Sequence, residues 1–115
     1  IYQPEIDYTM KRFTDRIFSS YNSFFESYSD LNIKVLFTFA PRNIDSLTEE
    51  STLENRKGLE HLLREKIRIP LISSMEDSFY PAYDFYKIDD HLTTEGAKER
   101  TKKVIRDLKC HLGDR

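Results

Sequence analysis

One stretch decides the fold: Ile33-Lys34-Val35-Leu36-Phe37-Thr38-Phe39, which is rich in β-branched and aromatic residues and almost continuously apolar toward its end. Such a short run is typical of a strand covered on both faces, as in a parallel sheet. A second run, Ile69-Pro70-Leu71-Ile72-Ser73, has the same character. Its proline stands near the start, where a missing N–H donor is tolerated. We therefore expect two buried strands, at 33–39 and 69–73.

Helical periodicity surrounds both predicted strands. Apolar side chains recur at steps of three and four from Ile6 to Tyr28, which predicts one long amphipathic helix. A second helix is expected over 53–67, and a third from an N-cap at Thr93 to about Leu112, with Gly113 as its stop. The inner side of the second helix is expected to hold Leu59, Leu62, Leu63 and Ile67. The inner side of the third is expected to hold Ala97, Thr101, Val104, Ile105, Leu108 and Leu112.

The remaining stretches, 40–52 and 74–86, are rich in polar or turn-forming residues and are expected to be loops. The order is then helix, strand, helix, strand, loop, helix, which predicts an α/β layered fold with a parallel sheet. Two strands are too few for a parallel sheet of this kind. Residues 1–115 are expected to be a single α/β unit. Either it contains further short strands that the sequence does not reveal, or its sheet is incomplete.

Composition limits the classes of partner. The 115 residues suffice for one small domain, and fifteen phenylalanine and tyrosine residues argue against disorder. A net charge of −2 gives no electrostatic reason to expect nucleic acid or an anionic membrane as partner. The basic residues between Lys98 and Arg106 are mixed with acids, so a solvated helix face is expected. No run is long and apolar enough to span a bilayer. The single cysteine, Cys110, excludes an internal disulfide and is expected to be a small core residue.

The most chemically suggestive residues are Asp89, Asp90 and His91, directly before the third helix. Ligands of open α/β sheets collect beyond the carboxyl ends of the strands, so 40–43 and 74–91 are expected to share one rim. A histidine there is a candidate general base if a carboxylate fixes its tautomer. Asp89, two residues earlier, has a suitable offset, and Asp90 is the adjacent alternative. A competing interpretation is that Asp90 or Thr93 caps the helix and His91 is a surface loop residue.

The segment Tyr86-Lys87-Ile88-Asp89-Asp90-His91-Leu92-Thr93-Thr94-Glu95-Gly96-Ala97 resembles the C-terminal block of SGNH (GDSL-like) hydrolases, written D-x-x-H-L-polar-x-x-G-A. The resemblance implies that His91 is the catalytic base, that an aspartate orients it, and that Leu92 and Gly96 seat the loop and helix. Position 88 is isoleucine, so the spacing is D-x-H through Asp89. That spacing is similar to the variant in alginate-type polysaccharide O-acetyltransferases. The implied fold is part of a flavodoxin-like three-layer domain with a parallel sheet, with this chain as its C-terminal half.

The function implied by the resemblance is that of a serine ester hydrolase or O-acyltransferase acting on small acyl esters, O-acetyl groups on a glycan among them. The chain contains neither G-D-S nor G-x-S-x-G, so the nucleophile is expected from an N-terminal segment or another chain that completes the domain. Ser73 and Ser74 end a predicted strand, where a structural role is expected. The alternative function is a non-catalytic α/β module for binding or assembly, with a degenerate site.

Other candidate residues carry weaker signals. Arg42, after the first predicted strand, either faces the rim and binds an anionic group or is an exposed arginine without a partner. His61 and His111 are expected to be solvent-facing. The spacing of histidine, cysteine and acidic residues matches no known metal site, and no glycine-rich phosphate loop is present, so neither a metal nor a cofactor is expected.

Overall fold

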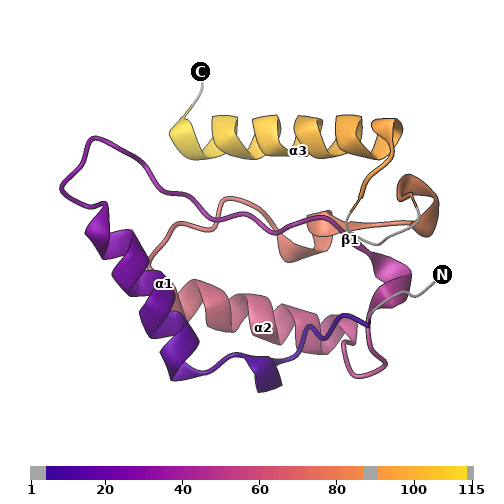
Figure 1. The fold of residues 1–115 in the computed structure, drawn as a ribbon, viewed down its shortest axis with the longest axis horizontal. Coiled ribbons are helices and arrows are strands. Elements are labelled where there is room, and N and C mark those ends of the chain that lie inside the picture. Colours follow the sequence, from indigo (N-terminus) through magenta and orange to yellow (C-terminus); the bar gives the residue numbers. More distant parts are fainter. Residues whose placement is uncertain (1–4, 87–90, 114–115) are drawn as a thin grey trace.

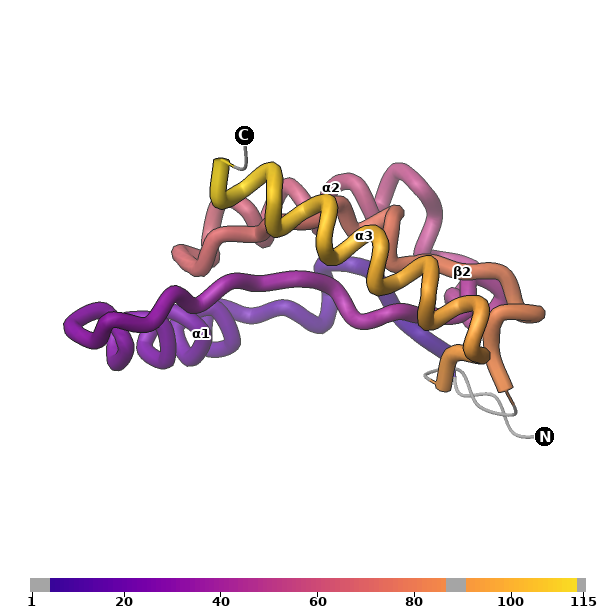
Figure 2. The backbone as a smooth tube through the Cα atoms, turned by 90° about the horizontal axis from the view of Figure 1, so that it is seen from above, coloured from indigo at the N-terminus to yellow at the C-terminus, as the bar shows by residue number. Residues whose placement is uncertain are grey.

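The computed structural model describes residues 5–86 and 91–113 (Figure 1). Extended segments around Phe37 and Leu71 run side by side through the middle of the molecule, with α3 (Thr94–Leu112) on one side of them and α1 (Asp15–Ser27) and α2 (Leu53–Lys66) on the other (Figure 1). Seen from above, the C-terminal helix crosses over the paired segments (Figure 2). The α-helices in the described part are α1, α2 and α3. The chain is therefore a mixed α/β unit, as predicted.

Each α-helix begins at a threonine cap. The hydroxyl oxygens of Thr14, Thr52 and Thr93 accept the backbone N–H three residues further on, which satisfies a donor that has no partner within the helix. At its other end α3 stops at Gly113, whose φ of 70° lies in the left-handed region that favours glycine. The predicted extents of the second and third helices are thereby confirmed to within about one residue.

The sheet is parallel, but its strands lie further along the chain than predicted. Strand β1 (Arg42–Asn43) pairs in parallel with β2 (Phe79–Tyr80), both in stretches expected to be loops. The predicted pair is present upstream as a single parallel bridge between Phe37 and Leu71. A 3-10 turn, Met75–Ser78, separates this bridge from β2 and interrupts the pairing. The predicted parallel pairing is confirmed. The prediction of two continuous strands at 33–39 and 69–73 is wrong.

The first predicted helix is wrong over its N-terminal part. Residue Ile6 is extended and forms a parallel bridge with Leu47: its N–H donates to the Ser46 carbonyl at 2.8 Å, and its carbonyl accepts from Thr48 at 3.0 Å. A short 3-10 turn, Met10–Arg12, follows, and α1 begins only after the Thr14 cap. The competing partner lies some forty positions away, so the local periodicity carries no sign of it.

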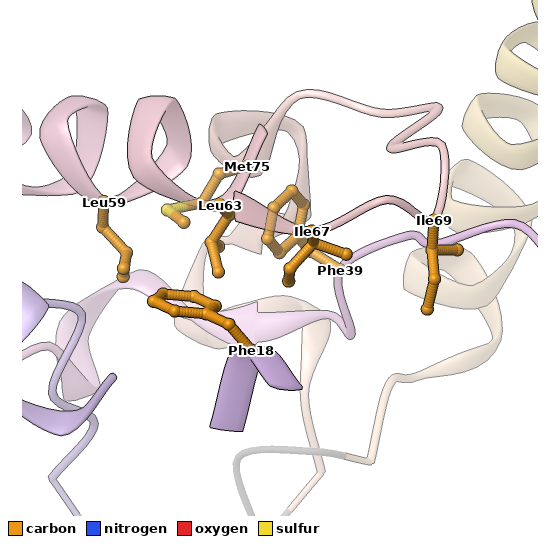
Figure 3. Close-up of a cluster of buried hydrophobic side chains, with 7 residues drawn as sticks. All are labelled: Phe18, Phe39, Leu59, Leu63, Ile67, Ile69 and Met75. Carbon is orange, nitrogen blue, oxygen red and sulfur yellow. The ribbon is translucent and has the colours of Figure 1, made fainter. Parts of the chain in front are cut away.

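The core lies between α1, α2 and the two extended segments (Figure 3). Leu59 and Leu63 of α2 are almost completely buried, and Phe18 of α1 points toward them (Figure 3). The predicted inner side of the second helix is thus confirmed. Tyr21 and Phe24, from the apolar stripe predicted for the first helix, are instead 38% and 50% exposed. The buried cluster consists of Phe18, Phe39, Leu59, Leu63, Ile67, Ile69 and Met75.

Helix α3 is held mainly by polar contacts, which corrects its predicted inner face. The Lys103 ammonium lies 4.3 Å from the centre of the Tyr80 ring and donates to the Asp77 carbonyl at 2.9 Å, while Arg106 pairs with the Asp77 carboxylate at 2.7 Å. Of the six residues predicted to face inward, only Val104 and Leu108 are half-buried, and the others are exposed. Cys110 is also exposed, so its predicted core position is wrong. Long basic side chains provide the contact that the apolar stripe was expected to make.

Candidate functional site

The candidate site lies where the chain leaves β2 and turns back into α3. After Tyr80 the chain forms a short 3-10 turn, Ala82–Asp84, and then an extended stretch at Phe85 and Tyr86. It returns at His91, directly before α3. The two candidate orienting acids, Asp89 and Asp90, lie outside the described residues. The structure therefore describes the candidate base, His91. The orienting role of Asp89 or Asp90 stays a prediction.

A pair of backbone hydrogen bonds fixes the position of His91. The Tyr86 N–H donates to the His91 carbonyl at 2.9 Å, and the Thr93 N–H donates to the Asp84 carbonyl at 2.7 Å. Between them, Phe85 and Leu92 form an antiparallel bridge. The backbone from the His91 carbonyl to Thr93 is thus tied to the stretch that leaves the sheet, while the histidine itself is exposed. The backbone that carries the His91 side chain is thus held in place, and the side chain is accessible to a ligand. A catalytic base requires both.

Close packing at Gly96 holds this turn against the first turn of α3. A Cβ atom at position 96 would lie 2.8 Å from the Asp84 carbonyl oxygen and 3.0 Å from Leu92 Cδ2. Only a residue without a side chain allows this approach, and Gly96 is buried. The same Asp84 carbonyl accepts the Thr93 N–H, so the glycine protects one of the two bonds that brace the histidine. Leu92 and Gly96 therefore seat the turn on the helix in this geometry.

An open cleft of about 540 Å³ lies beside the turn. Its walls are Tyr86 and Leu92 from the turn and the neighbouring face of α3, including Thr94, Lys98 and Thr101. Tyr86 is 63% exposed. Sequence reasoning gave Tyr86 no role; the available signal was an aromatic residue adjoining the acid–histidine segment, too common a feature to single it out. The cleft gives a small ligand room within reach of the turn.

The rim is shifted along the chain relative to its predicted position. Since β1 ends at Asn43 and β2 at Tyr80, the described residues beyond the strand ends are 44–46, 81–86 and His91. Ser73 lies upstream of that edge and is buried, with its hydroxyl 2.8 Å from that of Thr38. This bond agrees with the structural role expected for Ser73. The stretch 40–43, predicted to be part of the rim, instead contains β1.

Arg42 belongs to strand β1 and is half-buried beside Tyr8. Burial raises the pKa of the Tyr8 phenol, and the charge and hydrogen bond of the Arg42 guanidinium offset only part of that rise. The interpretation of Arg42 as an arginine without a partner is therefore wrong. The remaining histidines, His61 and His111, are exposed, as predicted.

Two features are absent from the described ranges: a cluster of potential metal ligands and a helix able to cross a bilayer. Among residues 5–86 and 91–113, no group of three or more histidine, cysteine or acidic side chains is placed to hold a metal ion. In the same ranges, no helix combines the length and the apolar character that a bilayer crossing needs.

The chain was compared with known protein families, curated proteins and solved structures. None of the three comparisons gives a match. The residues of the turn and their geometry are therefore the features that point to a function.

Proposed function

We propose that this chain supplies the histidine base of an SGNH-type serine ester hydrolase or O-acyltransferase. The observation that carries the proposal is the braced turn, which presents an exposed His91 at the start of α3, beyond the end of a parallel strand. That is the edge at which open α/β sheets bind ligands. The resemblance of the D-x-H-L and G-A spacing of the sequence to the SGNH block supports the base role of His91.

In the proposed reaction, His91 takes the proton of a serine hydroxyl as the serine oxygen attacks the ester carbonyl. Collapse of the tetrahedral intermediate breaks the bond to the alcohol oxygen, and the imidazolium returns the proton to that oxygen. An acyl-serine remains, which water or a second alcohol resolves with His91 again acting as base. Asp89, or Asp90 in its place, would accept the other ring N–H and hold the imidazole. The serine comes from outside these 115 residues.

The cleft beside the turn supports a substrate of modest size. Its aromatic, hydroxyl and ammonium groups suit an acyl ester of a polyhydroxylated alcohol, such as an O-acetylated glycan. The proposal extends to the fold: the parallel pairing and the helices on both sides of it are compatible with part of a flavodoxin-like three-layer domain.

A fluorophosphonate probe tests the proposal on the natural full-length protein that contains this chain. Such a probe phosphonylates a serine only when a base activates its hydroxyl. We expect saturable labelling of one serine, and labelling at least about a hundredfold slower in His91→Ala. His61→Ala is the matched control, because His61 on α2 is also exposed, and it should label at the wild-type rate. Equal labelling of the His91 variant and the wild type, or no labelled serine, would contradict the proposal.

A further inference from the structure

The extended segment at 33–39 has an open edge. Both backbone groups of Phe37 are used on one side: its N–H donates to the Pro70 carbonyl at 2.9 Å, and its carbonyl accepts from the Ile72 N–H at 3.0 Å. In an extended chain, the N–H and C=O groups of successive residues point to alternate sides. Leu36 and Thr38 therefore direct theirs away from 69–73. Among the described residues, no backbone hydrogen bond is recorded for these groups.

Two apolar hollows flank this edge. One, of about 570 Å³, lies against α1 and is lined by exposed aromatic side chains, including Tyr21 and Phe24. The other, of about 330 Å³, lies between the end of α1 and His111 of α3. Val35 and Leu36 contribute to both hollows. An apolar lining around an unpaired backbone edge is typical of a strand inside a sheet. It is not typical of an edge strand that faces solvent.

The charged side chains that line these hollows are basic. The basic side chains in their linings are Arg16 in the larger hollow, and Lys34 and His111 in the smaller one, and neither lining includes an aspartate or glutamate. A chain that enters this region is therefore favoured if it carries a carboxylate next to its apolar part.

We propose that this edge receives an extended polypeptide segment as a further parallel strand. The backbone of that segment would bond to Leu36 and Thr38, its alternating apolar side chains would fill the two hollows, and an acidic residue would face Arg16 or Lys34. Parallel pairing fits best, because a strand with apolar surroundings on both faces is typical of parallel sheets, and β1 and β2 already pair in that direction. A second copy fits less well, since two-fold pairing through one edge would run antiparallel. The inference does not depend on the ester chemistry.

A synthetic strand provides the test. The probe is an eight-residue peptide of alternating valine and isoleucine with glutamate at both ends, and the control is the same peptide with every second backbone amide N-methylated. We expect saturable binding of the probe and at least about tenfold slower hydrogen exchange at the Leu36 and Thr38 amides. The N-methylated peptide should give neither effect. Equal binding of the two peptides, unchanged exchange at both amides, or dimerisation of the protein through this edge would overturn the proposal.

A substitution on the protein side gives an independent measurement. Thr38→Pro removes the edge-facing N–H, and proline is tolerated at such edge positions. The matched control is Thr38→Val, which loses the same hydroxyl contact with Ser73 but retains the N–H. The proline variant should bind the peptide about fivefold more weakly than the valine variant. Equal affinity of the two folded variants for the peptide would contradict the proposal. If the proline variant does not fold, the comparison of the probe with the N-methylated peptide on the wild-type protein tests the proposal instead.

Discussion

Replacing Gly96 with alanine is expected to lower the free energy of unfolding by about 1–2 kcal/mol. The new methyl group would meet the Asp84 carbonyl oxygen at 2.8 Å and the Asp84 Cβ at 3.1 Å. Relief requires α3 to move away from the turn, which lengthens the 2.7 Å bond from the Thr93 N–H to that carbonyl. The cost of this strain exceeds the helix propensity that alanine gains over glycine. Thermal or urea unfolding of the variant measures the difference.

Gly58 offers the same substitution in a different environment. It lies within α2, and the nearest atom to a Cβ there is the flexible end of Met10, at 4.0 Å. Gly58→Ala should therefore raise the free energy of unfolding, by about 0.5–1 kcal/mol. A destabilised Gly58 variant, or an unaffected Gly96 variant, would show that the contact at Asp84 is not the cause.

Replacing Leu59 with alanine is expected to cost about 3 kcal/mol of stability. Leu59 is 0% exposed and lies in the core cluster with Phe18, Leu63 and Met75 (Figure 3). The substitution removes buried apolar surface and leaves a cavity that neighbours on three separate segments can only partly fill. A loss of this size is a large part of the total stability of a small domain. Chemical unfolding, read from the midpoint with an unchanged slope, measures it.

Leu53 is the matched control for this prediction. It lies on the same helix but is 48% exposed, so Leu53→Ala should change the stability by no more than about 0.5 kcal/mol. Similar losses in the two variants would mean that the α2 face bearing Leu59 is not the centre of the core.

The elements that sequence reasoning predicted correctly are those with local signals. Helices α2 and α3 carry a threonine cap, a run of helix formers and, for α3, a glycine stop, all within a few residues of each boundary. The turn before α3 was also placed correctly, because His91 and Thr93 directly precede a strong helix signal. Its bracing was not predictable, since the bonds from Thr93 to Asp84 and from Tyr86 to His91 depend on a backbone return that no residue pattern encodes.

The errors concern contacts between distant segments. Ile6 continues the helical stripe of the first predicted helix, yet its backbone pairs with Leu47, and such tertiary pairing overrides local propensity. Helix α3 has an apolar stripe that includes Ile105 and Leu112, but both are exposed, because Lys103 and Arg106 make its contacts instead. Periodicity tells which side chains share a face, but it does not tell what that face packs against.

Ester hydrolysis by the natural full-length protein is the most direct test of the claim that His91 is a catalytic base. The measurement compares kcat/KM for a short-chain chromogenic ester between the wild type and His91→Ala. The imidazole is exposed, so the variant should unfold at the wild-type midpoint while kcat/KM falls at least about a thousandfold. Hydrolysis by the variant within about twofold of the wild type, at unchanged stability, would contradict the claim and leave the turn as a structural start for α3.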